Sequence, residues 1–146
     1  MAQGLSDLSA ALAGRLLDVA RMLDRLDRLE SGTGGWLVAQ DDGALAEAAA
    51  EMTLRALRAA ADPTNFAVLK YLATHAAAPV SELEKAAGLG RLALNERLSD
   101  LVQVGLAGRN IDTDQAQSTA AGAALVGLID SVSQATAKRL AEAFRS

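Results

Sequence analysis

The stretch VSELEKAAGLGRLALNERLSDLVQVGL, residues 80–106, decides the fold of this chain. A short helix is predicted over Ser81–Ala87 and is closed by Gly88, because glycine tolerates the left-handed conformation in which helices end. A second helix is predicted from about Gly90 to Val104, and it stops at the glycine that follows. Small and apolar residues of the first helix are expected to pack across the second, so that the second helix projects its first turns outward.

Further elements are predicted on both sides of this stretch. Upstream, Pro63–Thr74 is expected to form a helix, with Asp62 as its cap and proline in its first turn. Downstream, Leu106–Ile111 and Ala116–Thr119 are expected to be two short strands around the polar turn at residues 112–114. Three helices followed by a short hairpin is the order of elements in a winged helix-turn-helix.

Long helices are predicted outside this unit, over Leu5–Glu30, Ala44–Ala61 and Thr119–Phe144. Leucines recur at three- and four-residue steps in the first, which gathers them on one face. An apolar face this wide needs a partner, either another helix of the same chain or a second subunit. We favour a second subunit.

The predicted fold is therefore mainly α, a winged helix-turn-helix with long N- and C-terminal dimerisation helices and a small two-stranded wing. Alanine and leucine dominate its apolar content, which favours helices over a large sheet. The expected parts are an N-terminal helical dimerisation region at residues 1–61, the winged helix-turn-helix at 62–122 and a C-terminal dimerisation helix at 123–146.

Composition narrows the possible functions. The 146 residues include no cysteine and a single histidine, His75, so thiolate zinc sites and cysteine nucleophiles are excluded. No nucleophile–base pair or carboxylate cluster is evident, so we expect neither an enzyme, nor a cofactor, nor a metal. No apolar run of about 18 residues and no secretion signal is seen, so we expect a cytoplasmic protein without a membrane partner. The formal net charge of −4 disfavours nucleic-acid binding, although the charge of one face matters more than the total.

Several short motifs resemble those of known repressors. Residues 62–72, DPTNFAVLKYL, resemble the opening of the arsenical-resistance-repressor (ArsR-like) family, and residues 80–89, VSELEKAAGL, are similar to its second helix and turn. Leu98, Leu101 and the Gly-Leu pair at 105–106 fall where that family has its HLxxLxxxGLV ending. TAAG at residues 119–122 resembles the LTxxG that follows the wing in multiple-antibiotic-resistance repressors. The resemblance covers about 60 residues and does not include the metal ligands of the family.

The resemblance and the projected helix together imply a homodimer that binds double-stranded DNA as a transcriptional regulator, and we expect a repressor. The second helix of the opening stretch would enter the major groove, where arginine suits guanine and asparagine suits adenine. Hydroxyls near helix starts would contact phosphate, and a wing arginine would contact the backbone or the minor groove. The predicted DNA-contacting residues are Arg91, Asn95, Arg97, Arg109, Ser81 and Thr64.

An alternative stays open, because the chain departs from the family pattern. Asn65 replaces the usual arginine, and the wing carries Asp112 and Asp114, which repel phosphate. Leu92 and Leu94 are expected on the front of the DNA-facing helix, where exposed leucine is unusual. These features favour a winged helix kept as a protein–protein interaction module that has lost DNA binding.

An effector site is also expected. The glycine-rich segment at residues 31–35 is predicted to end the first helix, and Trp36 follows it. An unknown small-molecule or protein effector would bind near Trp36, in the crevice between the N-terminal helices and the winged unit. For the Trp36 side chain itself, we favour a structural role, packing against the protein, over direct stacking on a ligand.

Overall fold

The computed structural model describes residues 4, 6, 8–14, 17–18, 21 and 42–145, and the described residues before position 22 are helical. The predicted helix Leu5–Glu30 is thus described only in its first part. The glycine segment at 31–35 and the effector site expected near Trp36 lie outside the described residues.

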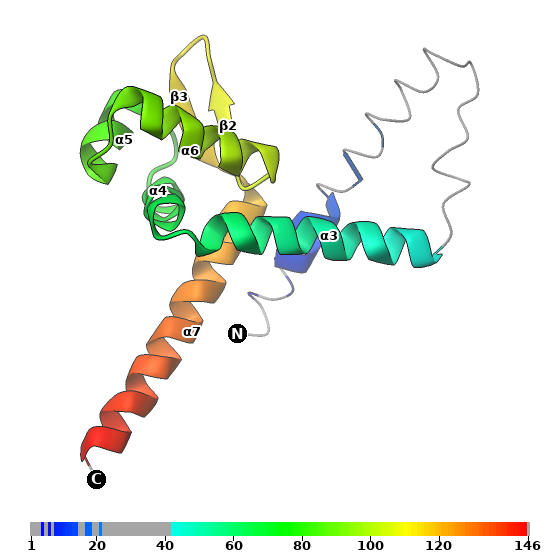
Figure 1. Ribbon diagram of the computed structural model, residues 1–146, viewed down its shortest axis with the longest axis vertical. Coiled ribbons are helices and arrows are strands. Elements are labelled where there is room, and N and C mark those ends of the chain that lie inside the picture. Colours follow the sequence, from blue (N-terminus) through cyan, green and yellow to red (C-terminus); the bar gives the residue numbers. More distant parts are fainter. Residues whose placement is uncertain are drawn as a thin grey trace.

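The described chain is mainly helical with one small antiparallel sheet, as the composition predicted (Figure 1). Asp62 begins α4 as its N-cap, since its carboxylate accepts hydrogen bonds from the backbone N–H groups of Thr64 and Asn65. The elements, in chain order, are α3 (Asp42–Ala61), α4 (Pro63–Thr74), β1 (Ala78–Pro79), α5 (Val80–Ala87), α6 (Arg91–Gln103), β2 (Ala107–Asn110), β3 (Gln115–Ser118) and α7 (Ala120–Arg145).

The sheet has three strands in the order β1-β3-β2, whereas the sequence predicted only two. β3 lies in the middle, so Ala116 pairs with Ala78 of β1 on one side and with Arg109 of β2 on the other. The prediction missed β1 because two residues carry no alternating pattern, and because proline is a poor strand residue. It is tolerated here because β1 is an edge strand.

The core lies where α4, α5 and α6 meet the sheet and the first half of α7. α6 contributes Leu94, Leu98 and Leu101, which are fully buried and lie on one face of the helix at four- and three-residue steps. Burying each such leucine contributes about 1.5–3 kcal/mol. The prediction that Leu94 is exposed beside Leu92 was wrong, because Leu94 belongs to this inward row.

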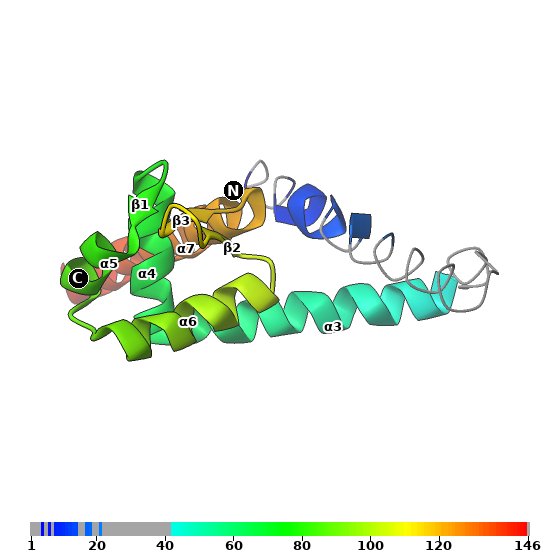
Figure 2. The same ribbon diagram turned by 90° about the horizontal axis from the view of Figure 1, so that it is seen from above.

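The two long helices extend beyond this core. α7 packs on α4 through its first half and then leaves the rest of the protein, and every residue at 131–145 is exposed (Figures 1 and 2). On the N-terminal side, Leu8 and Leu12 are buried within the chain, and they line an apolar groove with Leu45 and Met52 of α3. These two leucines have a partner within the same chain, and a second subunit stays a prediction for the rest of that apolar face.

α7 starts at a close approach to the end of α6. The Thr119 hydroxyl donates to the Gly105 carbonyl at 2.6 Å and accepts from the Gly122 N–H at 3.1 Å. A Cβ placed on Gly122 would lie 2.1 Å from the carbonyl oxygen of Leu106, which is backbone and cannot step aside. Position 122 therefore requires glycine in a helix that would otherwise favour alanine.

We expect Gly122→Ala to destabilise the protein by about 1–3 kcal/mol, because the added methyl forces α7 away from Leu106. Gly127→Ala is the matched control in the same helix, since a Cβ there meets nothing within 4 Å. It should stabilise the protein by about 0.5–1 kcal/mol through helix propensity. Urea unfolding followed by circular dichroism measures both, and equal effects would show that the approach at Gly122 is not tight.

Candidate nucleic-acid interface

A turn with two glycines joins α5 to α6 and sets the direction in which α6 begins. Gly88 ends α5 in the left-handed conformation, with φ of 66°, and its N–H donates to the Glu84 carbonyl. Gly90 then stands at the N-cap position of α6. Because the leucine row of α6 points inward, the opposite face is left to solvent. Its exposed residues are Leu92, Glu96, Ser99 and Gln103.

Three of the six predicted contact residues come together between α6 and the wing formed by β2 and β3. Arg91 Nη2 donates to both carboxylate oxygens of Asp114 at 2.6 Å, and Arg91 Nη1 lies 3.5 Å from Glu84 Oε2. Arg109 Nη1 donates to Asn95 Oδ1 at 3.0 Å, and Arg109 Nη2 donates to Asp114 Oδ1 at 3.4 Å. We call these five residues, Glu84, Arg91, Asn95, Arg109 and Asp114, the wing clasp.

Asp114 is the centre of the wing clasp, and its backbone is fixed as well as its side chain. It is the non-glycine residue with positive φ (51°) in the described part of the chain, a conformation that aspartate tolerates better than most residues. Its carbonyl accepts the N–H of Val80 at 3.0 Å, which ties the wing turn to the start of α5. The hydrogen bond from Arg91 is the main reason that the pKa of Asp114 lies below its ordinary value.

The two arginines of the wing clasp differ in accessibility. The Arg91 side chain is 44% exposed, whereas that of Arg109 is 25% exposed and its Nε is buried without a hydrogen-bond partner. The Arg109 guanidinium is directed toward α6 instead of extending from the wing tip. In its observed position Arg109 therefore supports Asn95, while Arg91 faces solvent more openly.

Arg97 lies on the other flank of α6, and Thr64 lies in the first turn of α4, where its N–H donates to Asp62 Oδ1 at 3.0 Å. Positions 95 and 97 are about 200° apart around a helix axis, so their side chains leave in nearly opposite directions. Arg97 Nη1 lies 3.4 Å from Asp62 Oδ2, the same carboxylate that caps α4. The pKa of Asp62 is lowered mainly by the hydrogen bond from the Asn65 N–H, and also by the charge of Arg97. Arg97 is thus placed to hold α6 against the start of α4.

Ser81 and Asn65 are the remaining residues that the sequence singled out. Ser81 is exposed at the start of α5. Asn65, which occupies the position of a family arginine, is 3% exposed, and its Nδ2 donates to the Ala59 carbonyl at the junction of α3 and α4. Its role is structural. The arginines also have three acidic partners that the sequence pattern does not predict, namely Asp62, Glu84 and Asp114. No local pattern joins Arg91 to Asp114, because they are 23 positions apart.

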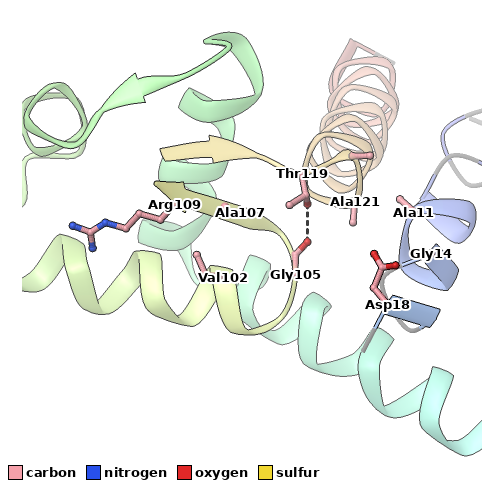
Figure 3. Close-up of a pocket in the computed structure, with 11 residues that line it drawn as sticks. Ala11, Gly14, Asp18, Val102, Gly105, Ala107, Arg109, Thr119 and Ala121 are labelled. Carbon is pink, nitrogen blue, oxygen red and sulfur yellow. Dashed lines mark hydrogen bonds between the residues drawn. The ribbon is translucent and has the colours of Figure 1, made fainter. Parts of the chain in front are cut away.

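A pocket of about 540 Å³ lies beside the base of the wing (Figure 3). Ala11, Gly14 and Asp18 line it from the N-terminal segment, opposite Gly105 and Thr119. Arg109 contributes to the lining, but Figure 3 shows its guanidinium pointing away from Asp18. The pocket therefore lacks a focused set of polar groups.

Comparisons of the chain with protein-family models, with curated proteins and with solved structures find no match. Within the part of the chain that the structure describes, no three His, Asp or Glu side chains gather as metal ligands would. The helices described at 42–145 include none with the length and apolar character needed to cross a bilayer.

We expect acid to weaken the two carboxylate contacts. The pKa values of Asp62 and Asp114 are lowered in the folded protein, so their stabilisation is present above the ordinary aspartate value of about 3.9 and is lost as the pH falls through the folded values. The double variant Asp62→Asn/Asp114→Asn should therefore lose less thermal stability than the wild type between pH 7 and about pH 3.

Differential scanning fluorimetry at the two pH values measures this loss. Asparagine also caps helices, so the variant keeps the start of α4. Asp112→Asn is the control, because the Asp112 carboxylate has no partner among the described residues, and it should behave as the wild type does. A double variant with the full wild-type loss would contradict the assignment.

Proposed function

We propose that this chain is a DNA-binding transcriptional regulator, a repressor, that acts in the cytoplasm and holds duplex DNA through a winged helix-turn-helix. The observation that carries the proposal is the element order α4-β1-α5-α6-β2-β3, with β1 on the outer edge of the wing sheet. This is the order of winged-helix proteins, and the family resemblance of residues 62–122 agrees with it. In such a unit α6 is the helix that enters the major groove.

The positions of the polar residues support this proposal. Arg91 and Asn95 stand one helical turn apart near the beginning of α6, on the flank that faces the wing. Arginine at the start of such a helix suits the guanine edge or a phosphate. Acidic groups surround these residues, so few phosphates are neutralised and we expect weak binding by a single subunit.

We further propose that two subunits bind together. The exposed half of α7 carries Val132, Leu140 and Phe144, and the last of these is 87% exposed. Two winged helices held one helical turn of DNA apart bind two half-sites, which multiplies a weak single contact. A dimer would therefore regain the DNA affinity that a single subunit loses because acidic groups surround Arg91.

A second candidate function is a winged helix used for protein–protein interaction. One observation favours it: Leu92 on the first turn of α6 is 76% exposed, and Ile111 at the wing tip is 81% exposed. Two large apolar side chains on the face that would meet DNA suit a protein surface better than a phosphate backbone. Leu92→Ser/Ile111→Ser would abolish binding to such a partner and leave binding to duplex DNA largely unchanged.

We expect the wild type to bind random-sequence duplex DNA, with affinity falling as salt rises, because released counterions supply most of the free energy. Arg91→Ala should weaken binding about tenfold, since each good arginine contact contributes about 1–3 kcal/mol. Fluorescence anisotropy at two salt concentrations measures both effects.

Lys138→Ala is the control for this experiment, because it also removes one positive charge, but from the exposed half of α7 instead of from α6. It should bind as the wild type does. Arg97→Ala tests the other flank of α6, and a smaller loss than for Arg91→Ala is expected because Arg97 is held by Asp62. Absence of any salt-sensitive binding to duplex DNA would refute the proposed function.

The dimer has its own test. Val132→Asp/Leu140→Asp should convert the protein to monomers, because it places charges on the proposed contact face of α7. Gln134→Asp/Lys138→Asp also adds two carboxylates to this exposed half, at positions that are already polar. That control should keep the wild-type mass in light scattering. A wild type that is already monomeric at micromolar concentration would contradict the proposal.

A further inference from the structure

The wing clasp resembles an occupied anion site. Asp114 presents both carboxylate oxygens to Arg91 at 2.6 Å, and one of them also lies 3.4 Å from Arg109 Nη2. Two guanidinium groups, one from the first turn of α6 and one from β2, thus meet on one small anion. Because guanidinium groups bind carboxylates and phosphates with the same fork of N–H donors, a phosphate oxygen fits the place of each Asp114 oxygen.

Asp114 is held in place through its backbone, while its side chain stays at the surface. The turn at Asp114 is fixed by the hydrogen bond from the Val80 N–H to its carbonyl, and the Asp114 side chain is 45% exposed. Rotation about the Asp114 side-chain bonds removes the carboxylate from the arginines without moving the strands. An external anion therefore has access to the site once this carboxylate turns away.

The charges of the wing clasp cancel. Arg91 and Arg109 carry two positive charges, and Glu84 and Asp114 carry two negative charges, so the site presents no net attraction to phosphate while the clasp is closed. Displacing one carboxylate restores one positive charge. The identity of residue 114 then decides how strongly the site attracts an anion.

We propose that Arg91 and Arg109 form a binding site for a phosphodiester group of DNA, and that Asp114 occupies this site as an internal substitute that the DNA displaces. This inference rests on the proposed function and adds the regulation of the same site. Asp114 competes with the DNA backbone, so it lowers affinity for every sequence. Every complex that uses this site has to displace Asp114, so this residue sets how tightly the protein holds duplex DNA.

The experiment compares Asp114→Asn with Asp112→Asn in the whole 146-residue chain. Both variants remove one negative charge from the same turn, but only Asp114 contacts arginines, since Asp112 is exposed and its carboxylate has no partner among the described residues. Asparagine also tolerates the positive φ at position 114. Asp114→Asn should bind random duplex about tenfold more tightly than Asp112→Asn, with a salt dependence steeper by about one phosphate contact.

Two outcomes of this comparison would overturn the inference. Equal gains in the two variants would mean that only the net charge of the wing matters. Weaker binding by Asp114→Asn would mean that Asp114 orients the arginines for DNA instead of competing with it. Thermal unfolding confirms that each variant is folded, and Asp114→Gly, which also accepts positive φ, replaces Asp114→Asn if that variant is unfolded.

A second probe separates this inference from the proposed function. Tripolyphosphate is titrated into each protein while the arginine Nε–Hε signals are followed by NMR. If no variant binds duplex DNA but Asp114→Asn binds tripolyphosphate more tightly than Asp112→Asn at Arg91 and Arg109, the anion site stands and the regulator proposal fails. If the two variants bind tripolyphosphate equally, the anion site is refuted, whatever happens with duplex DNA.

Discussion

The inward row of Leu94, Leu98 and Leu101 fixes the rotation of α6 about its own axis, and the rest of the candidate site depends on that rotation. Three fully buried leucines on one helical face contribute several kcal/mol in total, so α6 has one favourable orientation against α4, α5 and the sheet. The row decides that Arg91 and Asn95 face the wing and that Arg97 faces the start of α4. It also decides that Leu92 and Glu96 face solvent.

Opposite charges then organise the two flanks of this helix. On the wing side, Asp114 joins Arg91 to Arg109, and on the other side Asp62 joins Arg97 to the cap of α4. The Asp62 carboxylate also caps the backbone of α4, and the backbone carbonyl of Asp114 accepts the N–H of Val80 at the start of α5. Since exposed ion pairs contribute little to stability, their main consequence is to set which positive charges are free to meet a partner.

A steric constraint fixes where α7 begins. Thr119 and Gly122 bring α7 against the backbone at Gly105 and Leu106, so the long helix leaves the core at a defined place. The exposed half of α7 continues from this contact as part of the same helix. In the proposed dimer, the contact between the two α7 helices would therefore set the spacing of the two α6 helices.

Local signals in the sequence determined helices α3 to α7, strands β2 and β3 and the capping of α4. Glycines at 88, 90 and 105, the Asp-Pro pair at 62–63 and the spacing of leucines act within a few residues of themselves, so their consequences are readable without a structure. The same signals placed Arg91, Asn95 and Arg97 on one helix. They did not identify β1, whose two residues become a strand only because β3 lies beside them.

The tertiary structure alone decided the partners of those arginines. Asp114 is 23 residues from Arg91, and Asp62 is 35 residues from Arg97, so no periodicity joins them in the chain. It also buried Leu94, which sequence reasoning left exposed, and it enclosed Asn65 at the α3–α4 junction. Burial and ion pairing are properties of which surfaces meet, and a one-dimensional pattern fixes a side chain's face on its own helix but not what lies across from that face.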